Sequence, residues 1–237
     1  MQKTILITGA GRGIGHAIAE ALYSGNRLIL ITKTRASYLR IRKEFPKALC
    51  YACDITDSSA IDKTLNDIKS RFRAIDVLVN NAGIPYLLKY IDETSVQDLD
   101  LVYSLYMKGP FLITMSLLPL LRASRSPLVV NIASAAAFTR MPGEAVYSAA
   151  KSGMVTLMEI AREELQKHRI RVSIIEPYGV NTQNIPNPKD FLRPEDIGRL
   201  VKFIVDADPN CEILSVSLSS TGQWRQGTPP WVPKRKP

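Results

Sequence analysis

The stretch "TILITGAGRGIGHAIAEAL", residues 4–22, joins an apolar strand pattern to an amphipathic helix pattern through a glycine-rich turn. The turn contains Gly9, Gly13 and Gly15. The helix pattern places four apolar side chains on one face, namely Ile14, Ile18, Ala21 and Leu22. Residues without a Cβ let backbone N–H groups and the positive end of a helix approach a pyrophosphate. We therefore predict a dinucleotide phosphate site here, with a tight structural turn as the alternative.

Apolar runs alternate with helical spacing along almost the whole chain, which is typical of repeated strand–helix–strand units. The predicted strands are residues 4–8, 27–32, 48–53, 76–80, 128–134, 171–177 and 212–218. The predicted helices are residues 13–24, 36–44, 57–71, 95–122, 143–167 and 194–205. Several strands are continuous apolar runs, as expected when helices cover both faces of a parallel sheet. We predict an α/β fold, a doubly wound seven-stranded parallel sheet with helices on both faces in a Rossmann-like three-layer sandwich.

The chain has 237 residues, enough for one substantial core, and no internal repeat or linker divides it. We predict a single domain over residues 1–223 and a flexible, basic, proline-rich tail over residues 224–237. No apolar run approaches the roughly 20 residues of a transmembrane helix, and glycine and arginine interrupt the start before a signal-peptide core. The expected location is the cytoplasm, away from membranes.

The formal net charge is +9, and Lys234, Arg235 and Lys236 in the tail account for three of these charges. The rest are scattered, so we expect an anionic cofactor or substrate rather than nucleic acid. The three cysteines cannot all pair. Cys50 and Cys53 lie on opposite faces of a predicted strand, and no second cluster supplies zinc ligands. We predict buried, reduced thiols and no metal site.

Four motifs resemble the short-chain dehydrogenase/reductase family. The glycine spacing in "TGAGRGIG" is similar to the family's TGxxxGxG signature, and "CDITD" (53–57) is similar to its Asp-x-T-D stretch. "NNAG" (80–83) resembles the strand-ending motif that lines the cofactor cleft. Ser134 stands thirteen residues before Tyr147, and Tyr147-x-x-x-Lys151 resembles the catalytic pair. The resemblance implies an oxidoreductase that uses a nicotinamide cofactor.

The second predicted strand is followed by "KTRAS" (33–37), which contains no acid to bind the ribose 2′-OH of NAD. Lys33 and Arg35 occupy this region instead, and Arg12 lies in the glycine turn, so we predict NADP(H), whose 2′-phosphate attracts cations. Solvated surface charges are the alternative. Together with the contacts that the resemblance implies, the predicted cofactor-binding residues are Gly9, Gly11, Arg12, Gly13, Ile14, Gly15, Lys33, Arg35, Asp54, Ile55, Asn81, Ala82, Gly83, Tyr147, Lys151, Pro177, Val180 and Thr182.

Tyr147 and Lys151 lie one helical turn apart, so their side chains share a face. A phenol has a pKa of about 10, and an ammonium about 4 Å away can lower it by about three units at an effective dielectric of 20. We expect Tyr147 to protonate the alkoxide that forms when a carbonyl is reduced, and Ser134 to donate a hydrogen bond to the same oxygen. The alternative for Tyr147 is an ordinary residue of an amphipathic helix.

Two positions depart from the family pattern. The family carries an asparagine three residues before the glycine of its long fourth helix, where it helps to hold a water that relays protons to the lysine. Tyr106 stands there in this chain, and we expect its hydroxyl to hold a water in a catalytic role, although it lacks the paired donor and acceptor of an amide. Tyr178 replaces a glycine after the sixth strand, so we expect a different backbone course there.

The segment after Thr182 is short, and the resemblance places the substrate lid there, so we expect a small lid and an open pocket. The expected pocket lining is Ala135, Ala136, Tyr86, Met141 and Tyr178, which suits a flat or hydrophobic carbonyl compound. The leading hypothesis is an NADPH-dependent reductase of a ketone, aldehyde or diketone.

Other functions remain open. A 3-oxoacyl carrier protein reductase and a pteridine reductase of the sepiapterin type are alternatives within the family. A catalytically weak NADP-binding regulator or scaffold is an alternative of another class, because of Tyr106 and Tyr178. The resemblance also implies a homodimer or homotetramer that pairs through the long helices at residues 95–122 and 143–167.

Overall fold

The computed structural model describes residues 2–84, 88–182 and 191–221, which fold around one parallel sheet. The strands are β1 (Thr4–Thr8), β2 (Arg27–Thr32), β3 (Leu49–Ala52), β4 (Val77–Asn80), β5 (Leu128–Ile132), β6 (Arg171–Pro177) and β7 (Ser215–Leu218). Their order in the sheet is β3-β2-β1-β4-β5-β6-β7, and every pair is parallel. The predicted seven-stranded parallel sheet is confirmed.

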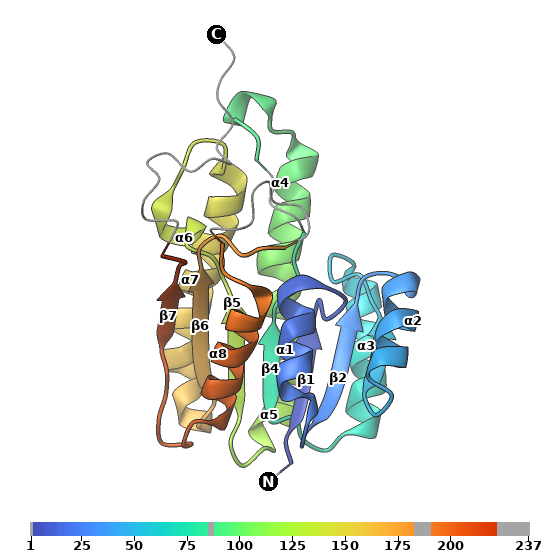
Figure 1. Cartoon of the computed structure of the whole chain (residues 1–237). Coiled ribbons are helices and arrows are strands. Elements are labelled where there is room, and N and C mark those ends of the chain that lie inside the picture. Colours follow the sequence, from blue (N-terminus) through green and yellow to red (C-terminus); the bar gives the residue numbers. More distant parts are fainter. Residues whose placement is uncertain (1, 85–87, 183–190, 222–237) are drawn as a thin grey trace.

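Two helical layers cover the sheet (Figure 1). One layer contains α1 (Gly13–Tyr23), α2 (Arg35–Glu44) and α8 (Pro194–Asp206), and the other contains α3 (Ser58–Arg71), α5 (Gly109–Arg122) and α7 (Ala145–Leu165). Successive strand residues point to opposite faces, so Ile5 and Ile7 join the first core while Leu6 joins the second. Because both faces are buried, the strands read as continuous apolar runs.

A single long helical segment runs from Val96 to Arg122 and contains α4 (Val96–Tyr103), a π-helical turn (Ser104–Lys108) and α5. This segment of 27 residues has a mean hydropathy of 1.3, so by length and composition it could span a membrane, contrary to the sequence-based expectation. Half of its most apolar window is buried inside the protein, where it packs on α3 and α7. Such packing is that of a core helix.

Several short elements were not predicted from the sequence: the 3₁₀ turns Ile91–Glu93 and Gln166–His168, and α6 (Ala136–Thr139). The last strand is also shorter than predicted. Arg162 donates to the Leu214 carbonyl, and Glu212 accepts from the Val172 backbone N–H. A side chain therefore takes the place of a backbone sheet bond at Val172, and β7 begins only at Ser215.

The cysteine prediction is partly confirmed. Cys50 packs with one core and Cys53 with the other, as expected from opposite faces of a strand, and burial raises the pKa of the Cys50 thiol to about 11. Cys211 is exposed, so the expectation that all three thiols are buried is wrong for this one. It lies in the turn after α8, where its own carbonyl accepts from Arg171.

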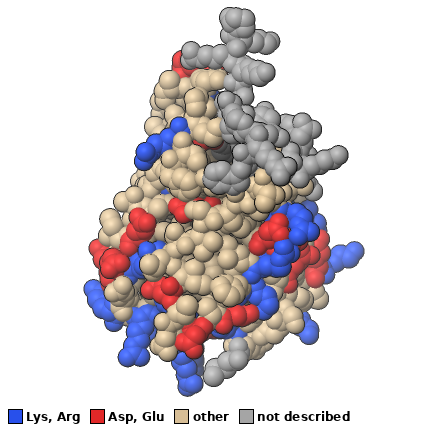
Figure 2. Space-filling model, turned by 60° about the vertical axis from the view of Figure 1, so that its left-hand side comes forward, with Lys and Arg blue, Asp and Glu red and all other residues tan. Residues whose placement is uncertain are grey.

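The strand order reverses between β1 and β4, whose carboxyl ends lie side by side. In open α/β sheets, a ligand crevice forms outside this point. In Figure 1 the α4 segment and the turn that contains α6 rise beyond the same edge. Figure 2 shows Lys and Arg interspersed with Asp and Glu over one face of the protein rather than gathered in a continuous basic patch.

Candidate active site

The glycine turn between β1 and α1 needs glycine for two physical reasons. Gly9 and Gly13 have φ of +70° and +54°, a region that side chains rarely adopt. A Cβ at Gly15 would lie 2.3 Å from both the Asn81 Nδ2 atom and the Gly9 carbonyl oxygen, closer than real Cβ atoms approach other atoms. The turn therefore packs directly on the residue that follows β4.

Thr8 joins the two central strands, and sequence reasoning missed it. Its Oγ1 accepts from the backbone N–H groups of Asn81 and Ala82 at 3.0 and 3.1 Å. Asn81 in turn donates its amide to the Thr8 carbonyl at 2.9 Å. The predicted residues of the "NNAG" motif thus lie against the glycine turn, as the resemblance implied. The position of Thr8 directly before Gly9 is a signal that could have identified it.

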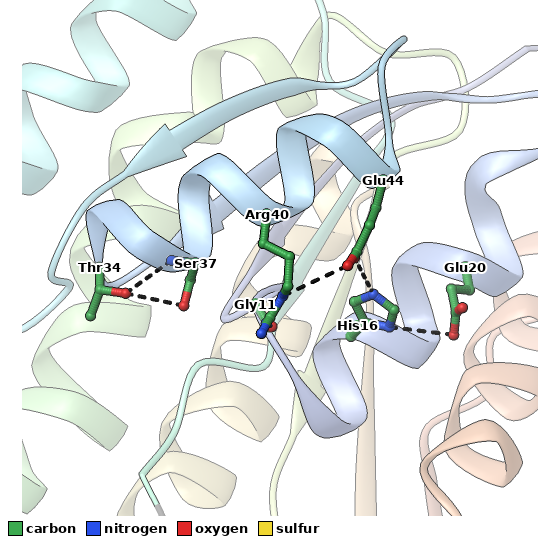
Figure 3. Close-up of polar contacts among 7 residues, drawn as sticks. All are labelled: Gly11, His16, Glu20, Thr34, Ser37, Arg40 and Glu44. Atoms are coloured by element: carbon green, nitrogen blue, oxygen red, sulfur yellow. Dashed lines mark hydrogen bonds and ion pairs between the residues drawn. The ribbon is translucent and has the colours of Figure 1, made fainter.

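Arg40 of α2 contacts the glycine turn from the other side (Figure 3). Its guanidinium donates to the Gly11 carbonyl and lies 3.8 Å from Glu44. Glu44 also bonds His16 of α1 at 2.8 Å, and His16 lies 3.4 Å from Glu20. These contacts connect α2, the turn and α1. No sequence spacing indicated that Arg40 would face the turn.

The cations predicted to bind a 2′-phosphate are arranged differently from one another. Lys33 forms an ion pair with Asp54 at 2.9 Å, and Arg35 lies over the ring of Tyr38 at 4.6 Å. Arg12 is exposed at the start of α1. Burial opposes the ionisation of Asp54, but hydrogen bonds from Lys33 and from Thr56 outweigh it and hold the pKa of this carboxyl below its ordinary value.

The turn after β6 approaches the glycine turn. A Cβ at Gly13 would lie 3.3 Å from Thr182 Cγ2, so Thr182 is adjacent to the glycine turn. Val180 is buried and forms a bridge with Leu192. Pro177 ends β6, and its carbonyl accepts from the Ala135 backbone N–H.

Two further predicted cofactor residues are partly or wholly structural. Ile55 is buried in the core, and its carbonyl oxygen lies 2.7 Å from the position of a Cβ at Gly109. Ile14 is partly buried and packs on the core beneath α1. Residues Gly83 and Ala82 follow the end of β4, on the same edge of the sheet as the glycine turn.

Ser134, Tyr147 and Lys151 come together at this edge. Ser134 follows β5 and forms a side-chain hydrogen bond with Tyr147, which is half-buried on the first turn of α7. Lys151 is buried, and its Nζ donates to the Ile132 carbonyl at 2.9 Å. The predicted trio therefore meets, and Lys151 Nζ lies 5.8 Å from the centre of the Tyr147 ring.

The electrostatic expectation for this pair is not met in the structure. Burial raises the pKa of Tyr147 above its ordinary value, with smaller raising effects from Tyr106 and Glu144 and a lowering one from Ser134. Burial also lowers the pKa of Lys151 to about 7. Both changes have one cause, because loss of water disfavours the charged form of each group. Tyr147 therefore keeps its proton at neutral pH, which is the form that can donate.

The Tyr106 hydroxyl, which we expect to hold a water, also bonds the protein backbone. It donates to the Ile84 carbonyl at 3.2 Å and accepts from the Ile84 N–H at 3.1 Å. The Tyr106 side chain is buried, and burial raises its pKa to about 12 against the lowering effect of the Ile84 bond. The donor of this phenol is thus committed to the Ile84 backbone, and one acceptor lone pair of the hydroxyl is left for a water.

The predicted pocket wall is partly described. Ala135 and Ala136 are buried around α6, and Met141 is partly buried beyond it. Tyr178 packs edge-on against Phe138, with ring centres 6.0 Å apart, a contact that sequence reasoning missed. Tyr86, residues 183–190 of the predicted lid and the tail at residues 224–237 lie outside the described residues.

Comparison with known proteins identifies the family. The family model described as short chain dehydrogenase matches residues 3–190. The chain belongs to the short-chain dehydrogenase family. It is 28% identical over 228 residues to a 3-oxoacyl-[acyl-carrier-protein] reductase from Synechocystis sp., covering 87% of this chain and 90% of that protein. It is therefore an oxidoreductase by family.

Solved structures agree with this assignment. A metagenomic short-chain oxidoreductase in complex with NADP has a TM-score of 0.80 and 28% identity, over 91% of this chain and 96% of that one. A 3-ketoacyl-(acyl-carrier-protein) reductase from Brucella melitensis complexed with NADH has a TM-score of 0.84 and 25% identity, over 93% and 98%. Members of the family bind a nicotinamide cofactor, and these two structures contain different ones.

The contact between Arg40 and the glycine turn predicts an effect on cofactor affinity. Arg40→Ala should raise the Kd of the nicotinamide cofactor about fivefold, because an exposed charged hydrogen bond that orders the turn is worth about 1 kcal/mol. Arg42→Ala is the matched control, since Arg42 lies on the same helix and bonds the Tyr38 hydroxyl. Calorimetric titration measures both. Equal Kd values for the two variants would contradict the role of Arg40.

Proposed function

We propose that this protein is an NADPH-dependent reductase that converts the carbonyl of a small ketone, aldehyde or diketone to an alcohol. The observation that carries the proposal is the meeting of Ser134, Tyr147 and Lys151 at the sheet edge that also holds the glycine turn. A hydrogen-bonded phenol and hydroxyl at such an edge can donate to one oxygen atom.

The residues at this edge fit a nicotinamide dinucleotide. Gly9, Gly13 and Gly15 leave a cradle beside the start of α1 that side chains would fill, and a helix start favours a pyrophosphate. Thr182 borders the same turn and would contact the carboxamide end. NADPH, when bound, supplies the hydride for the reduction.

The chain's own residues would handle the proton and the substrate oxygen. Tyr147 stays protonated at neutral pH because burial raises its pKa, so it can donate a proton to an alkoxide. Ser134 bonds the same phenol and would donate to the substrate oxygen once it is present. Lys151, whose pKa is lowered to about 7, would in its protonated form stabilise the phenolate that remains on Tyr147 after the proton has moved to the alkoxide.

The preference for NADPH rests on charge at the adenosine end. Arg12, Lys33 and Arg35 are exposed near the start of α1 and α2, and the first turn of α2 contains no acid. The ion pair with Asp54 weakens the contribution of Lys33, so Arg12 carries more of the expected attraction. The related NADP complex supports this choice, while the NADH complex keeps NAD as the alternative.

Among the remaining substrates, a 3-oxoacyl carrier protein is favoured by the Synechocystis relative and belongs in the test panel beside a pterin. We expect the protein to act in the cytoplasm, without nucleic acid or membrane. A regulator that binds NADPH without turnover is the alternative from another class.

We also propose self-association through an apolar groove between α5 and α7, lined in part by Phe111, Met115, Leu157 and Ile160. Three of these large side chains are exposed, namely Phe111, Met115 and Ile160. Exposed apolar patches of this kind mark association surfaces. A second copy would cover the groove.

The catalytic proposal predicts that Tyr147→Phe loses turnover but keeps its affinity for the cofactor. Its kcat should fall at least about 100-fold, since it removes the proton donor, while its Kd for NADPH stays within about twofold of wild type. NADPH oxidation is followed by absorbance with a panel of aldehydes, diketones, a pterin and a 3-oxoacyl thioester. Tyr103→Phe is the control, because Tyr103 is an exposed tyrosine on α4. Wild-type protein that binds NADPH but reduces nothing would favour the regulator.

The charge argument predicts the cofactor preference. Arg12→Gln and Lys33→Gln should raise the Kd of NADP⁺ by about tenfold and about threefold and leave that of NAD⁺ nearly unchanged, because only the former has a 2′-phosphate. Arg27→Gln is the control, since Arg27 begins the strand that Lys33 follows and so lies at the opposite sheet edge. Parallel losses for both cofactors would refute the assignment.

The groove predicts an effect on oligomeric state. Ile160→Glu should shift the protein to monomers in light scattering, because a carboxylate cannot be buried there without a partner. Ile91→Glu, at an exposed apolar residue outside the groove, should leave the mass unchanged. A wild-type monomer at all concentrations would rule out the pairing.

A further inference from the structure

Tyr106 contacts three parts of the candidate active site at once. It lies in the π-helical turn Ser104–Lys108, and only 4% of its surface is exposed. The Lys151 Nζ atom lies 4.2 Å from the centre of its ring. The ring also meets that of Tyr147 edge to face, with centres 5.4 Å apart and planes at 88°. The hydroxyl bonds the Ile84 backbone.

The contact with Lys151 matters because that ammonium is buried. Its Nζ donates to the Ile132 carbonyl, and no ion pair among the described residues joins it to an acid. The face of an aromatic ring attracts a cation within about 6 Å, more strongly where water is excluded. Of the two rings in reach, Tyr106 at 4.2 Å is nearer than Tyr147 at 5.8 Å.

The contact with Tyr147 restricts the orientation of the proton donor. Edge-to-face pairs at this separation are a preferred arrangement of aromatic rings. Tyr106 is held in place on its other end by the two bonds to Ile84, on the segment that follows Gly83. A Cβ at Gly83 would lie 3.2 Å from the Tyr106 hydroxyl, so glycine there leaves room for the phenol.

We propose that Tyr106 is a positioning residue whose ring holds Lys151 and Tyr147 in place and whose hydroxyl fixes the segment after β4. The inference rests on the proposed reductase function for its kinetic consequences but not for its structural ones. The ring and the hydroxyl of Tyr106 have different roles, so a substitution that removes one and keeps the other tests each role by itself. Tyr106→Phe keeps the ring, and Tyr106→Leu removes it.

The pKa of Lys151 reports directly on the presence of the Tyr106 ring. The titratable groups around it and Tyr147 are Tyr106 from the π-helical turn and Glu144 from the start of α7. Losing the ring face removes an interaction that favours the charged ammonium, so the pKa of Lys151 falls further. We expect a fall of about one unit in Tyr106→Leu, which is tenfold in the ionisation constant, and less than about 0.3 unit in Tyr106→Phe.

The test is a titration of the lysine ¹³Cε signals by NMR, with the Lys151 signal assigned from its absence in Lys151→Arg. It needs no turnover, so it decides the positioning role even if the reductase proposal fails. Val102→Ala, which removes buried apolar volume from the preceding turn of the same helical segment, is the control for destabilisation. Should Tyr106→Leu not fold, Tyr106→Met supplies a flexible side chain without a ring.

Kinetic measurements also distinguish the role of the Tyr106 ring from that of its hydroxyl. Tyr106→Leu should lower kcat at least about tenfold and move the limb of the pH profile that reports Lys151 to lower pH. Tyr106→Phe should keep kcat within about threefold and raise the KM for NADPH, since the segment after β4 is loosened. A Lys151 titration in folded Tyr106→Leu or Tyr106→Met that matches wild type would overturn the proposal. So would a shift in Tyr106→Phe as large as in Tyr106→Leu, because the ring would then not be the cause.

Discussion

The close contact between the ends of β1 and β4 is the constraint on which the rest of the site depends. Thr8 and Asn81 exchange hydrogen bonds across the two strands, and the space beside Gly15 admits no Cβ. These bonds hold the loops after the two strands together, so the glycine turn and residues 81–84 form one edge. That edge supports the phosphate cradle on one side and the Tyr106 contact on the other.

Burial away from water sets the charge states of Tyr147 and Lys151. Burial pushes the pKa of Tyr147 up and that of Lys151 down to about 7, so both groups favour their neutral forms near neutral pH. An ammonium that is always charged would be expensive to bury without an acid, whereas a lysine with a pKa of about 7 is charged only part of the time near neutral pH. The Ile132 carbonyl and the Tyr106 ring are the contacts that make such a charge tolerable.

Patterns local in sequence predicted the sheet and most helix bounds, because apolar periodicity and turn chemistry act over a few residues. The meeting of Ser134 with Tyr147 and Lys151 was instead implied by the resemblance to the family. Local patterns did not predict contacts made by long side chains across the fold. The Arg40 bond to Gly11 and the pairing of Lys33 with Asp54 join residues that no spacing relates. The π-helical turn was also missed, since a helix with one inserted residue keeps nearly the same apolar pattern.

The π-helical turn Ser104–Lys108 explains how one helical segment contacts residues at both ends of the predicted cofactor site. Its wider ring of backbone, closed by the bond from the Gly109 N–H to the Ser104 carbonyl, changes the direction of the side chains that follow α4. Tyr106 faces the catalytic pair from this turn. Gly109, three residues later, lets the backbone pack against the Ile55 carbonyl, next to Asp54 at the adenosine end. Because Tyr106 and Gly109 belong to one continuous helical segment, helix geometry rather than a loop sets the spacing between the acid–base pair and the residues after β3.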